Sequence, residues 1–240
     1  MRFCLNVDHV ATLRNARGES QPDPVTFALM AEQFGIDGIV VHLREDRRHI
    51  NERDLRLLRE LVTTKLDLEM AAVKEIIDIA CDVQPDLATI VPEKRLELTT
   101  EGGINVIDNI DKLRSAIERL HAAEVPVSLF IEPEIEQIDV ASEIGADFIE
   151  IHTGHYANAN GEEEMYDELD KIKLAAKHAK KLGLGVNAGH GLDYNNMKEF
   201  IAIEEIDEVS IGHAVIARAL FTGIEEAIKE MISLTRAQKS

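Results

Sequence analysis

The sequence has few aromatic residues, almost no cysteine and no long apolar run. Of its 240 residues none is tryptophan, three are tyrosine and seven are phenylalanine. The two cysteines, Cys4 and Cys81, are too far apart for a zinc motif or a redox pair, so we expect small buried thiols in a reducing compartment. No apolar run approaches the roughly 18 residues that a membrane span requires. These absences argue against a disulfide-stabilised scaffold and against a transmembrane protein.

Basic residues are also scarce in comparison with acidic ones. The chain has 26 Lys and Arg against 45 Asp and Glu, and its formal net charge is −19. This charge repels nucleic acid and anionic lipid, so an anionic ligand requires a local cluster of cations. Polar residues also interrupt the N-terminus before the apolar segment of a signal peptide could form. We therefore expect a soluble, cytoplasmic protein with no nucleic-acid and no membrane partner.

Short runs rich in β-branched residues alternate with segments that carry apolar residues at helical spacing. The predicted strands are 2–8, 38–43, 65–70, 87–92, 126–132, 148–152, 184–188 and 208–212. The predicted helices are 24–34, 51–62, 73–82, 106–123, 134–144, 162–182, 194–203 and 224–236. Such alternation predicts parallel strands joined by helices. The length, and the lack of any linker-like segment, predict a single domain over 1–240.

Each predicted strand has one apolar face and one polar face. The polar faces carry Asn6, Asp8, His42, Arg44, Asp67, Glu69, Thr89, Glu93, Ser128, Glu132, Glu150, His152, Asn187 and Ser210. A doubly wound sheet is covered by helices on both sides and should have apolar strands throughout. A one-sided antiparallel sheet could expose a polar face, but short hairpins would join its strands. The pattern therefore favours an α/β fold, a closed (β/α)8 TIM barrel with a polar interior.

Histidines gather at the predicted strand ends. Seven of the nine lie there or just after them: His9, His42, His49, His152, His155, His190 and His213. In a (β/α)8 barrel the carboxyl ends of all strands meet at one face, where the active sites of this fold lie. One such histidine could be structural, but seven on one face predict a functional site.

Two glycine-rich segments predict a phosphate site. Gly189, His190 and Gly191 follow the seventh strand, and Gly212 and His213 follow the eighth. The next stretch, AVIARALFTG, has the length of a short extra helix before the closing helix. Barrels commonly bind phosphate with these two loops and the N-terminus of such a helix. Simple turn formation would also explain the glycines.

Cations follow the first two strands. Arg14 and Arg17 are expected in a long loop that ends near Pro22 and Pro24. A second group follows the second strand and consists of Arg44, Arg47, Arg48 and His49. Guanidinium groups suit phosphate oxygens, although a solvated charged loop is an alternative for Arg47 and Arg48. Arg44 has the same parity as His42 and should point to the barrel mouth.

Two carboxyl groups, Glu69 and Glu150, share the inward parity and lie among imidazoles. Burial raises a carboxyl pKa and a nearby cation lowers it, so either group can be tuned for proton transfer. A structural ion pair is the alternative for both. Strand one lacks a His-x-His pair and no helix contains HExxH, so we expect no catalytic metal.

Long strings at the strand ends resemble the pyridoxine 5′-phosphate synthase family, in order and over essentially the whole chain. They are NVDHVATLRNARG at 6–18, VHLREDRRHI at 41–50, LEMA at 68–71, VPEKRLELTTEGG at 91–103, FIEIHTGHYA at 148–157, NAGHGL at 187–192 and IGHA at 211–214. The resemblance implies a barrel enzyme of the deoxyxylulose-dependent vitamin B6 pathway. Such an enzyme condenses 3-amino-2-oxopropyl phosphate with 1-deoxy-D-xylulose 5-phosphate to pyridoxine 5′-phosphate, inorganic phosphate and water, with no cofactor. It also implies a homo-octamer built from dimers.

The resemblance also implies roles for individual residues. The acid–base groups would be His42, Glu69 and His190, with Glu150 stabilising charge in the transition state. The residues that hold the aminoketone phosphate would be Asn6, Arg17, Gly191, Gly212 and His213. Those that hold the deoxyxylulose phosphate would be Asp8, His9, Arg44, His49 and Thr99.

Two other functions stay open. A different sugar-phosphate barrel, such as an isomerase or epimerase, would need one phosphate site and fewer acid–base groups. A catalytically silent barrel that binds a phosphorylated metabolite would need none. The second cation cluster, around Arg44 and His49, argues against the first, and the acid–base residues argue against the second.

Overall fold

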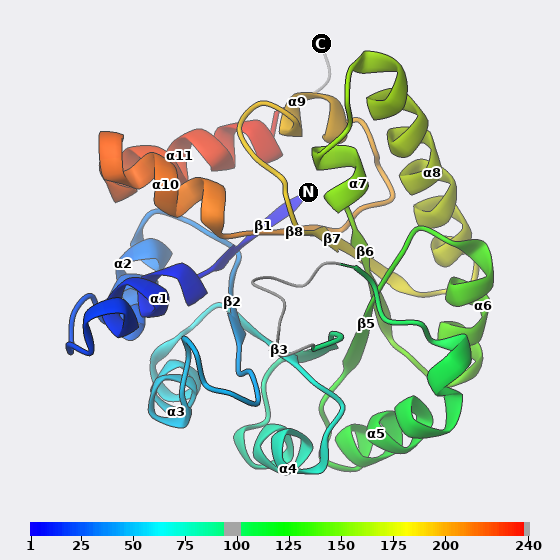
Figure 1. Cartoon of the computed structure of the whole chain (residues 1–240), viewed down its shortest axis with the longest axis horizontal. Helices are drawn as coiled ribbons and strands as arrows, with labels where there is room; N and C mark the ends of the chain where they lie inside the picture. The colour runs from blue at the N-terminus through cyan, green and yellow to red at the C-terminus, as the bar shows by residue number, and fades with distance from the viewer. Residues whose placement is uncertain (94–101, 238–240) are drawn as a thin grey trace.

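Eight parallel strands form a closed barrel surrounded by helices in the computed structural model, which describes residues 1–93 and 102–237 (Figure 1). The strands are β1 Arg2–Asn6, β2 Gly38–His42, β3 Lys65–Met70, β4 Leu87–Ile90, β5 Val127–Ile131, β6 Phe148–His152, β7 Gly185–Gly189 and β8 Glu208–Ile211. They neighbour one another in sequence order, and β8 pairs with β1 to close the barrel. The prediction of a (β/α)8 barrel is confirmed.

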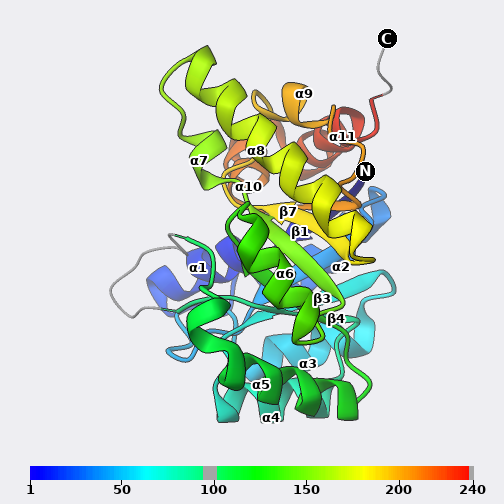
Figure 2. The same cartoon turned by 90° about the vertical axis from the view of Figure 1, so that its right-hand side faces the viewer.

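The α-helices surround the strands, and a 3-10 turn at Ile107–Asn109 precedes one of them. They are α1 Asp8–Arg17, α2 Pro24–Gln33, α3 Glu52–Leu61, α4 Lys74–Val83, α5 Ile110–Ala122, α6 Ile135–Glu143, α7 Gly154–Ala157, α8 Glu162–Lys181, α9 Met197–Phe200, α10 His213–Thr222 and α11 Ile224–Thr235. Figure 2 shows the barrel from the side, with α4 and α5 packed next to each other. Within the described ranges, no helix has both the length and the apolar character needed to cross a membrane.

The hydrophobic core lies between the strands and the helix ring. Leu5, Ile39, Leu68 and Ile149 point outward from their strands and are completely buried. The longer helices cover this layer with apolar stripes, because residues three or four apart share a helix face. Burying one such side chain contributes about 1.5–3 kcal/mol, so this layer is a major source of stability. The polar face of each strand therefore points into the barrel interior.

Residues 8–17 form a helix, so the expected long loop after the first strand is wrong. The strand ends at Asn6 and α1 begins at Asp8. Val10 and Ala11 are buried on the inner side of α1, and Gly18 ends the helix in the left-handed conformation that glycine adopts without strain. The expected loop therefore begins only after Gly18.

The extra helix after the eighth strand is present. It is α10, which starts at His213 directly after Gly212 and ends before Gly223. It packs against α11, the closing helix of the barrel. The expected helix over 194–203 is much shorter, because only Met197–Phe200 form the α-helix α9.

Candidate active site

The polar strand faces point into the barrel, as their parity predicts. Asp67, Thr89, Ser128, Glu150 and Asn187 are all buried although their side chains are polar. Removing so many polar groups from water is costly unless they pair or serve a reaction. The interior and its carboxyl-end mouth are therefore the candidate site.

His42, the last residue of β2, lies between two glutamates. Its Nε2 is 2.8 Å from Oε1 of Glu93, and its Nδ1 is 3.8 Å from Oε2 of Glu69. The second oxygen of Glu93 accepts a hydrogen bond from the Glu45 backbone N–H. Glu93 thus fixes the imidazole plane and leaves Nδ1 facing Glu69. Sequence parity placed Glu93 on the polar face, but its bond to His42 across 51 residues had no sequence signal.

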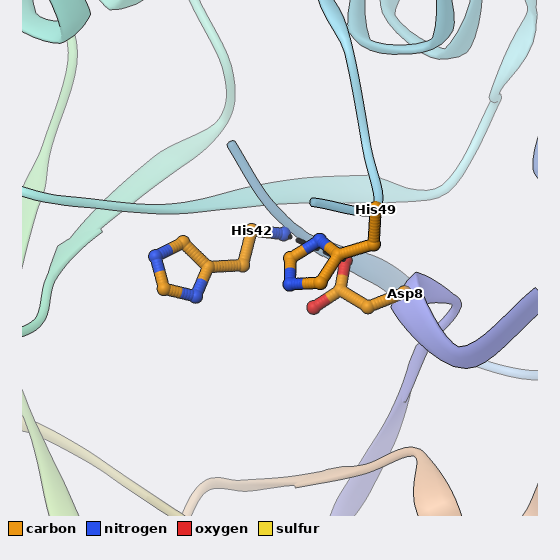
Figure 3. Close-up of side chains that lie close together, drawn as sticks. All are labelled: Asp8, His42 and His49. Atoms are coloured by element: carbon orange, nitrogen blue, oxygen red, sulfur yellow. Dashed lines mark hydrogen bonds and ion pairs between the residues drawn. The ribbon is translucent and has the colours of Figure 1, made fainter. Parts of the chain in front are cut away.

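Asp8 connects the beginning of α1 to the same region. One of its oxygens accepts the backbone N–H of His42 at 2.9 Å, and the other accepts the side-chain amide of Asn6 at 3.0 Å. Figure 3 shows the His49 imidazole beside this carboxylate, and its Nδ1 is 3.8 Å from Asp8 Oδ1. Burial lowers the pKa of His49 although Asp8 opposes this effect. The structure therefore brings Asn6, Asp8, His42 and His49 together.

Neighbouring carboxyl groups have opposite pKa shifts. Burial, reinforced by the charges of Glu150 and Asp8, raises the pKa of Glu69 well above its usual value. Burial and the charge of Asp67 raise the pKa of Glu150 to about 8. Burial also penalises the Glu93 carboxylate, but the hydrogen bond and charge of His42, the backbone N–H of Glu45 and the charge of Arg44 together lower its pKa. A carboxyl group whose neutral form is favoured and one whose ionised form is favoured thus flank one imidazole, an arrangement suited to acid–base chemistry.

The segment after β7 places His190 at the same mouth. His190 has a φ of 77°, and its carbonyl oxygen accepts a hydrogen bond from Thr153 Oγ1 at 2.6 Å. Burial, followed by the charge of His152, lowers the pKa of His190 and favours the neutral imidazole. Gly189 makes room for the interior acid, since a Cβ there would lie 2.2 Å from Glu150 Oε1.

The N-terminus of α10 faces the beginning of the chain. A Cβ on Gly212 would lie 2.9 Å from the Asn6 carbonyl oxygen, so glycine is needed for the close approach of β1 and α10. The rings of His9 and His213 lie 5.3 Å apart, edge to face. Backbone N–H groups and imidazoles at a helix N-terminus are suited to a phosphate.

The expected cations have different environments. Arg44 is buried near the mouth with Nε 3.6 Å from Asp46, while Arg17 is exposed at the end of α1. Arg14 instead holds the protein together, because it donates to Asp54 and to the His49 carbonyl oxygen. Arg47 and Arg48 are paired with carboxylates, Glu52 and Glu75 for the former and Asp46 for the latter. Thr99 lies outside the described residues.

A charged network at the opposite end of the interior was not predicted. Lys65 Nζ lies 2.5 Å from Glu208 Oε1 and 3.3 Å from Asp67 Oδ2. Thr89 donates to the other oxygen of Asp67 at 2.8 Å, and Arg2 lies 3.5 Å from Glu208. Lys65 and Glu208 are the first residues of β3 and β8. Each lies two residues before an inward-facing residue, Asp67 or Ser210, and this spacing was the sequence evidence that they also face inward.

Among residues 1–93 and 102–237, two groups of side chains have a geometry that could hold a metal ion. One is Asp8, His42 and His49, which belongs to the site just described. The other is Glu132, His152 and His155, at the ends of the neighbouring strands β5 and β6. In each group one ligand atom per residue lies within 4.8 Å of the others.

The fold and the site define a class, a (β/α)8-barrel enzyme with an acid–base centre at the carboxyl ends of its strands. Within that class, residues 3–237 match the family described as "Pyridoxal phosphate biosynthesis protein PdxJ", and the chain belongs to this family.

Curated relatives agree with this assignment. A pyridoxine 5′-phosphate synthase of Pelodictyon phaeoclathratiforme is 57% identical over 236 residues, which cover 98% of this chain and 100% of the relative. Proteins of the same name from Chloroherpeton thalassium and Geobacter sp. strain M21 are 58% and 55% identical, each over 98% of this chain and 99% and 98% of their own lengths.

Solved structures show similarity of fold alone. "Native KDPGal structure" aligns with a TM-score of 0.64 and 13% identity over 98% of this chain and 93% of that chain. A Thermotoga maritima phosphoribosylanthranilate isomerase aligns with a TM-score of 0.59 and 15% identity over 98% of both chains.

Proposed function

We propose that the chain is a pyridoxine 5′-phosphate synthase. It condenses 3-amino-2-oxopropyl phosphate with 1-deoxy-D-xylulose 5-phosphate and releases pyridoxine 5′-phosphate, inorganic phosphate and water. The observation that supports this reaction best is the arrangement at His42, whose imidazole lies between Glu69, with a raised pKa, and Glu93, with a lowered pKa. A condensation with several proton transfers needs groups of this kind near neutral pH.

Two phosphorylated substrates require two groups of anion ligands inside an acidic protein. For the aminoketone phosphate we propose Asn6, Arg17, Gly191, Gly212 and His213. For the deoxyxylulose phosphate we propose Asp8, His9, Arg44, His49 and Thr99. In the second group the carboxylate of Asp8 would accept from substrate hydroxyls, while the cationic and imidazole groups would hold the phosphate.

The reaction begins when the amine of the aminoketone attacks the deoxyxylulose ketone. Protonation of the carbinol oxygen and loss of water give an imine between the substrates. Glu69 suits this donor role because its raised pKa favours the protonated form, and after donation its carboxylate can take a proton from carbon. His42 would pass protons to and from Glu69 across the 3.8 Å between them.

Later steps expel the sugar phosphate and close the ring. His190, held neutral by burial, can take the proton that enamine formation releases and return it to a departing oxygen. Aldol-type attack then joins the two substrates by a carbon–carbon bond, and loss of water makes the pyridine ring aromatic. Glu150 lies beneath these groups and, as a neutral acid, would hydrogen-bond to the developing oxyanion.

We also propose a cytoplasmic homo-oligomer, an octamer built from dimers. Leu220 and Phe221, at the end of α10, are 73% and 89% exposed. Large apolar side chains exposed side by side are typical of protein interfaces. Sedimentation analysis should give a mass several times that of one chain, and a monomer at all concentrations would contradict the assembly.

The function is tested with purified, metal-stripped protein and both phosphorylated substrates. Absorbance and mass spectrometry should detect pyridoxine 5′-phosphate, and omission of either substrate should abolish it. Product that forms equally without one substrate would contradict the condensation. Binding of both compounds without any product would favour a silent metabolite-binding barrel.

A further inference from the structure

Outside the proposed acid–base groups, Glu132, His152 and His155 form a compact cluster at the barrel mouth. His152 Nδ1 is 2.8 Å from Glu132 Oε1, and His155 Nε2 is 3.8 Å from Glu132 Oε2. The two imidazole rings are 5.8 Å apart and nearly perpendicular. The three residues come from the end of β5, the end of β6 and the short helix α7. The fold therefore brings two nitrogen ligands and one carboxylate to one point.

Two of the three side chains are held rigidly. The ring of His152 lies 5.3 Å from Phe130 and 5.1 Å from His190, and the residue is 4% exposed. Glycine at position 154 leaves room for it, since a Cβ there would lie 2.4 Å from His152 Nε2. Glu132 is fixed by the backbone N–H of Gly103, which donates to Oε1 at 2.8 Å. A preorganised ligand set loses little entropy when it binds a ligand.

One polar atom of this cluster is unsatisfied. His152 Nε2 is buried and has no hydrogen-bond partner in residues 1–93 and 102–237. A buried polar atom without a partner costs free energy, and it is seldom tolerated without a role. When a metal binds one ring nitrogen of a histidine, the other carries the N–H and can donate to water or substrate. The unpaired nitrogen is therefore consistent with a ring that can change its tautomer when a ligand arrives.

The charge and exposure of the cluster favour a cation. Burial penalises the Glu132 carboxylate, but its hydrogen bonds with His152 and Gly103 outweigh this and lower its pKa. The side chains of Glu132 and His155 are 25% and 68% exposed, whereas that of His152 is 4% exposed. A cation can thus enter from solvent past His155 and reach an ionised carboxylate.

We propose that Glu132, His152 and His155 form a binding site for Zn²⁺ or a similar divalent transition-metal ion. Two imidazoles and one carboxylate are a common zinc ligand set, with the fourth position left to water. Zinc–ligand distances of about 2.0–2.2 Å place tetrahedral ligands about 3.3–3.6 Å apart. One ligand atom from each of the three residues lies within 4.8 Å of the others, and the exposed His155 side chain can rotate to bring them closer around a metal ion.

This site differs from the other group that could hold a metal ion, Asp8, His42 and His49, which we assign to substrate binding and proton transfer. Its binding of metal does not depend on the proposed reaction. The ring of His190 is 5.1 Å from His152, so a bound dication would lie beside the proposed active site. Its positive charge would disfavour protonation of His190.

Metal binding is measured with the full-length protein after removal of metals by a chelator. Zn²⁺ is titrated in competition with a chromophoric chelator, and Co²⁺ is used as a spectroscopic probe of a four- or five-coordinate site. The variants are His155→Ala and Glu132→Gln. His121→Ala is the matched control, because His121 is a partly exposed histidine paired with a carboxylate, Asp147, at 2.8 Å. His49→Asn reports on the Asp8 group.

We expect one equivalent of Zn²⁺ per chain and visible Co²⁺ bands of high intensity. His155→Ala should weaken Zn²⁺ binding by at least about 100-fold, because a lost direct ligand costs more than a lost outer-shell partner. Glu132→Gln should also weaken it, while His121→Ala and His49→Asn should not. Unchanged binding by His155→Ala, binding lost only in His49→Asn, or no binding at excess Zn²⁺ would each overturn the proposal. Since His155 is exposed, its replacement does not threaten folding.

Discussion

At the scale of single residues, the proposed chemistry depends on unequal environments for similar groups. Glu69 and Glu93 both flank His42, yet burial among acids raises the pKa of the first, while the imidazole and the other hydrogen-bonding and charged neighbours together lower the pKa of the second. Because Glu93 fixes Nε2, the free nitrogen of the ring faces Glu69. A small approach of the two side chains, or one bridging water, would allow a proton to pass across the 3.8 Å between them.

Glu69→Gln should lower turnover by roughly 10²–10⁴, the usual effect of removing a general acid or base. Glutamine has the same size and can still donate a hydrogen bond, so binding of both phosphorylated ligands should be largely kept. Steady-state kinetics and ligand titration measure the two effects separately. Glu136→Gln, on the exposed side of α6, is the matched control. Turnover near that of the control would remove Glu69 from the mechanism.

Glu150 makes the stability of the protein depend on pH. Its carboxyl pKa rises from 4.5 to about 8 on folding, so between these values the folded state keeps a proton that the unfolded chain has lost. Stability therefore falls as the pH rises through this range, by about 1.4 kcal/mol per pH unit. Glu150→Gln should reduce this slope, with the buried Glu69 and Asp67 supplying the rest, and be more stable than the unchanged protein at pH 8. Equal slopes in urea unfolding at several pH values would contradict the assignment.

Sequence parity identified most of the candidate site but not its hydrogen bonds. The inward positions of His42, Glu69 and Glu150 follow from a repeat of two residues per strand, which every β-strand obeys. The contact between His42 and Glu93 depends on how neighbouring strands are staggered, and one sequence does not contain this information. Arg47 and Arg48 pair with nearby carboxylates, and the sequence left open whether they would instead bind phosphate, because charged residues in one loop allow both.

At the scale of secondary-structure elements, the beginning of α10 is the most constrained part of the proposed phosphate site. Gly212 precedes the first residue of this helix and touches β1 at Asn6. By contrast, α1 was missed because its sequence, DHVATLRNAR, is mostly polar and has only a narrow apolar stripe. Its buried Arg14 occupies an inner position that a pattern of apolar residues does not recognise.

Gly212→Ala should reduce kcat/KM for the aminoketone phosphate by about 10–100-fold, because a displacement near 1 Å has effects of this size. The new Cβ would lie 2.9 Å from both the Cβ and the carbonyl oxygen of Asn6, so α10 must move outward. The KM for deoxyxylulose phosphate serves as the internal control and should change much less. Equal changes for both substrates would contradict a separate aminoketone phosphate site at α10.

At the scale of the whole molecule, closure of the barrel joins strands from both ends of the sequence. Lys65 on β3 pairs with Glu208 on β8, and Arg2 on β1 reaches the same carboxylate. Burial lowers the pKa of Lys65, but the charges of Asp67 and Glu208 outweigh this and raise it. At the amino ends of the strands, the barrel interior thus holds a lysine paired with buried carboxylates. The proposed acid–base centre lies at the carboxyl ends of the strands.

Lys65→Met should destabilise the protein by about 3–5 kcal/mol at neutral pH, because it leaves Asp67 buried without its cation and Glu208 with only the more distant Arg2. The loss should be smaller at acidic pH, since burial already raises the pKa of Asp67 and protonation relieves an unpaired carboxylate. Urea unfolding at acidic and neutral pH measures both effects. Lys74→Met, which removes an exposed partner of Asp78 on α4, should leave the unfolding midpoint nearly unchanged. If the two variants were equally stable at neutral pH, the network would not hold the barrel closed, and the outer apolar layer alone would account for its stability.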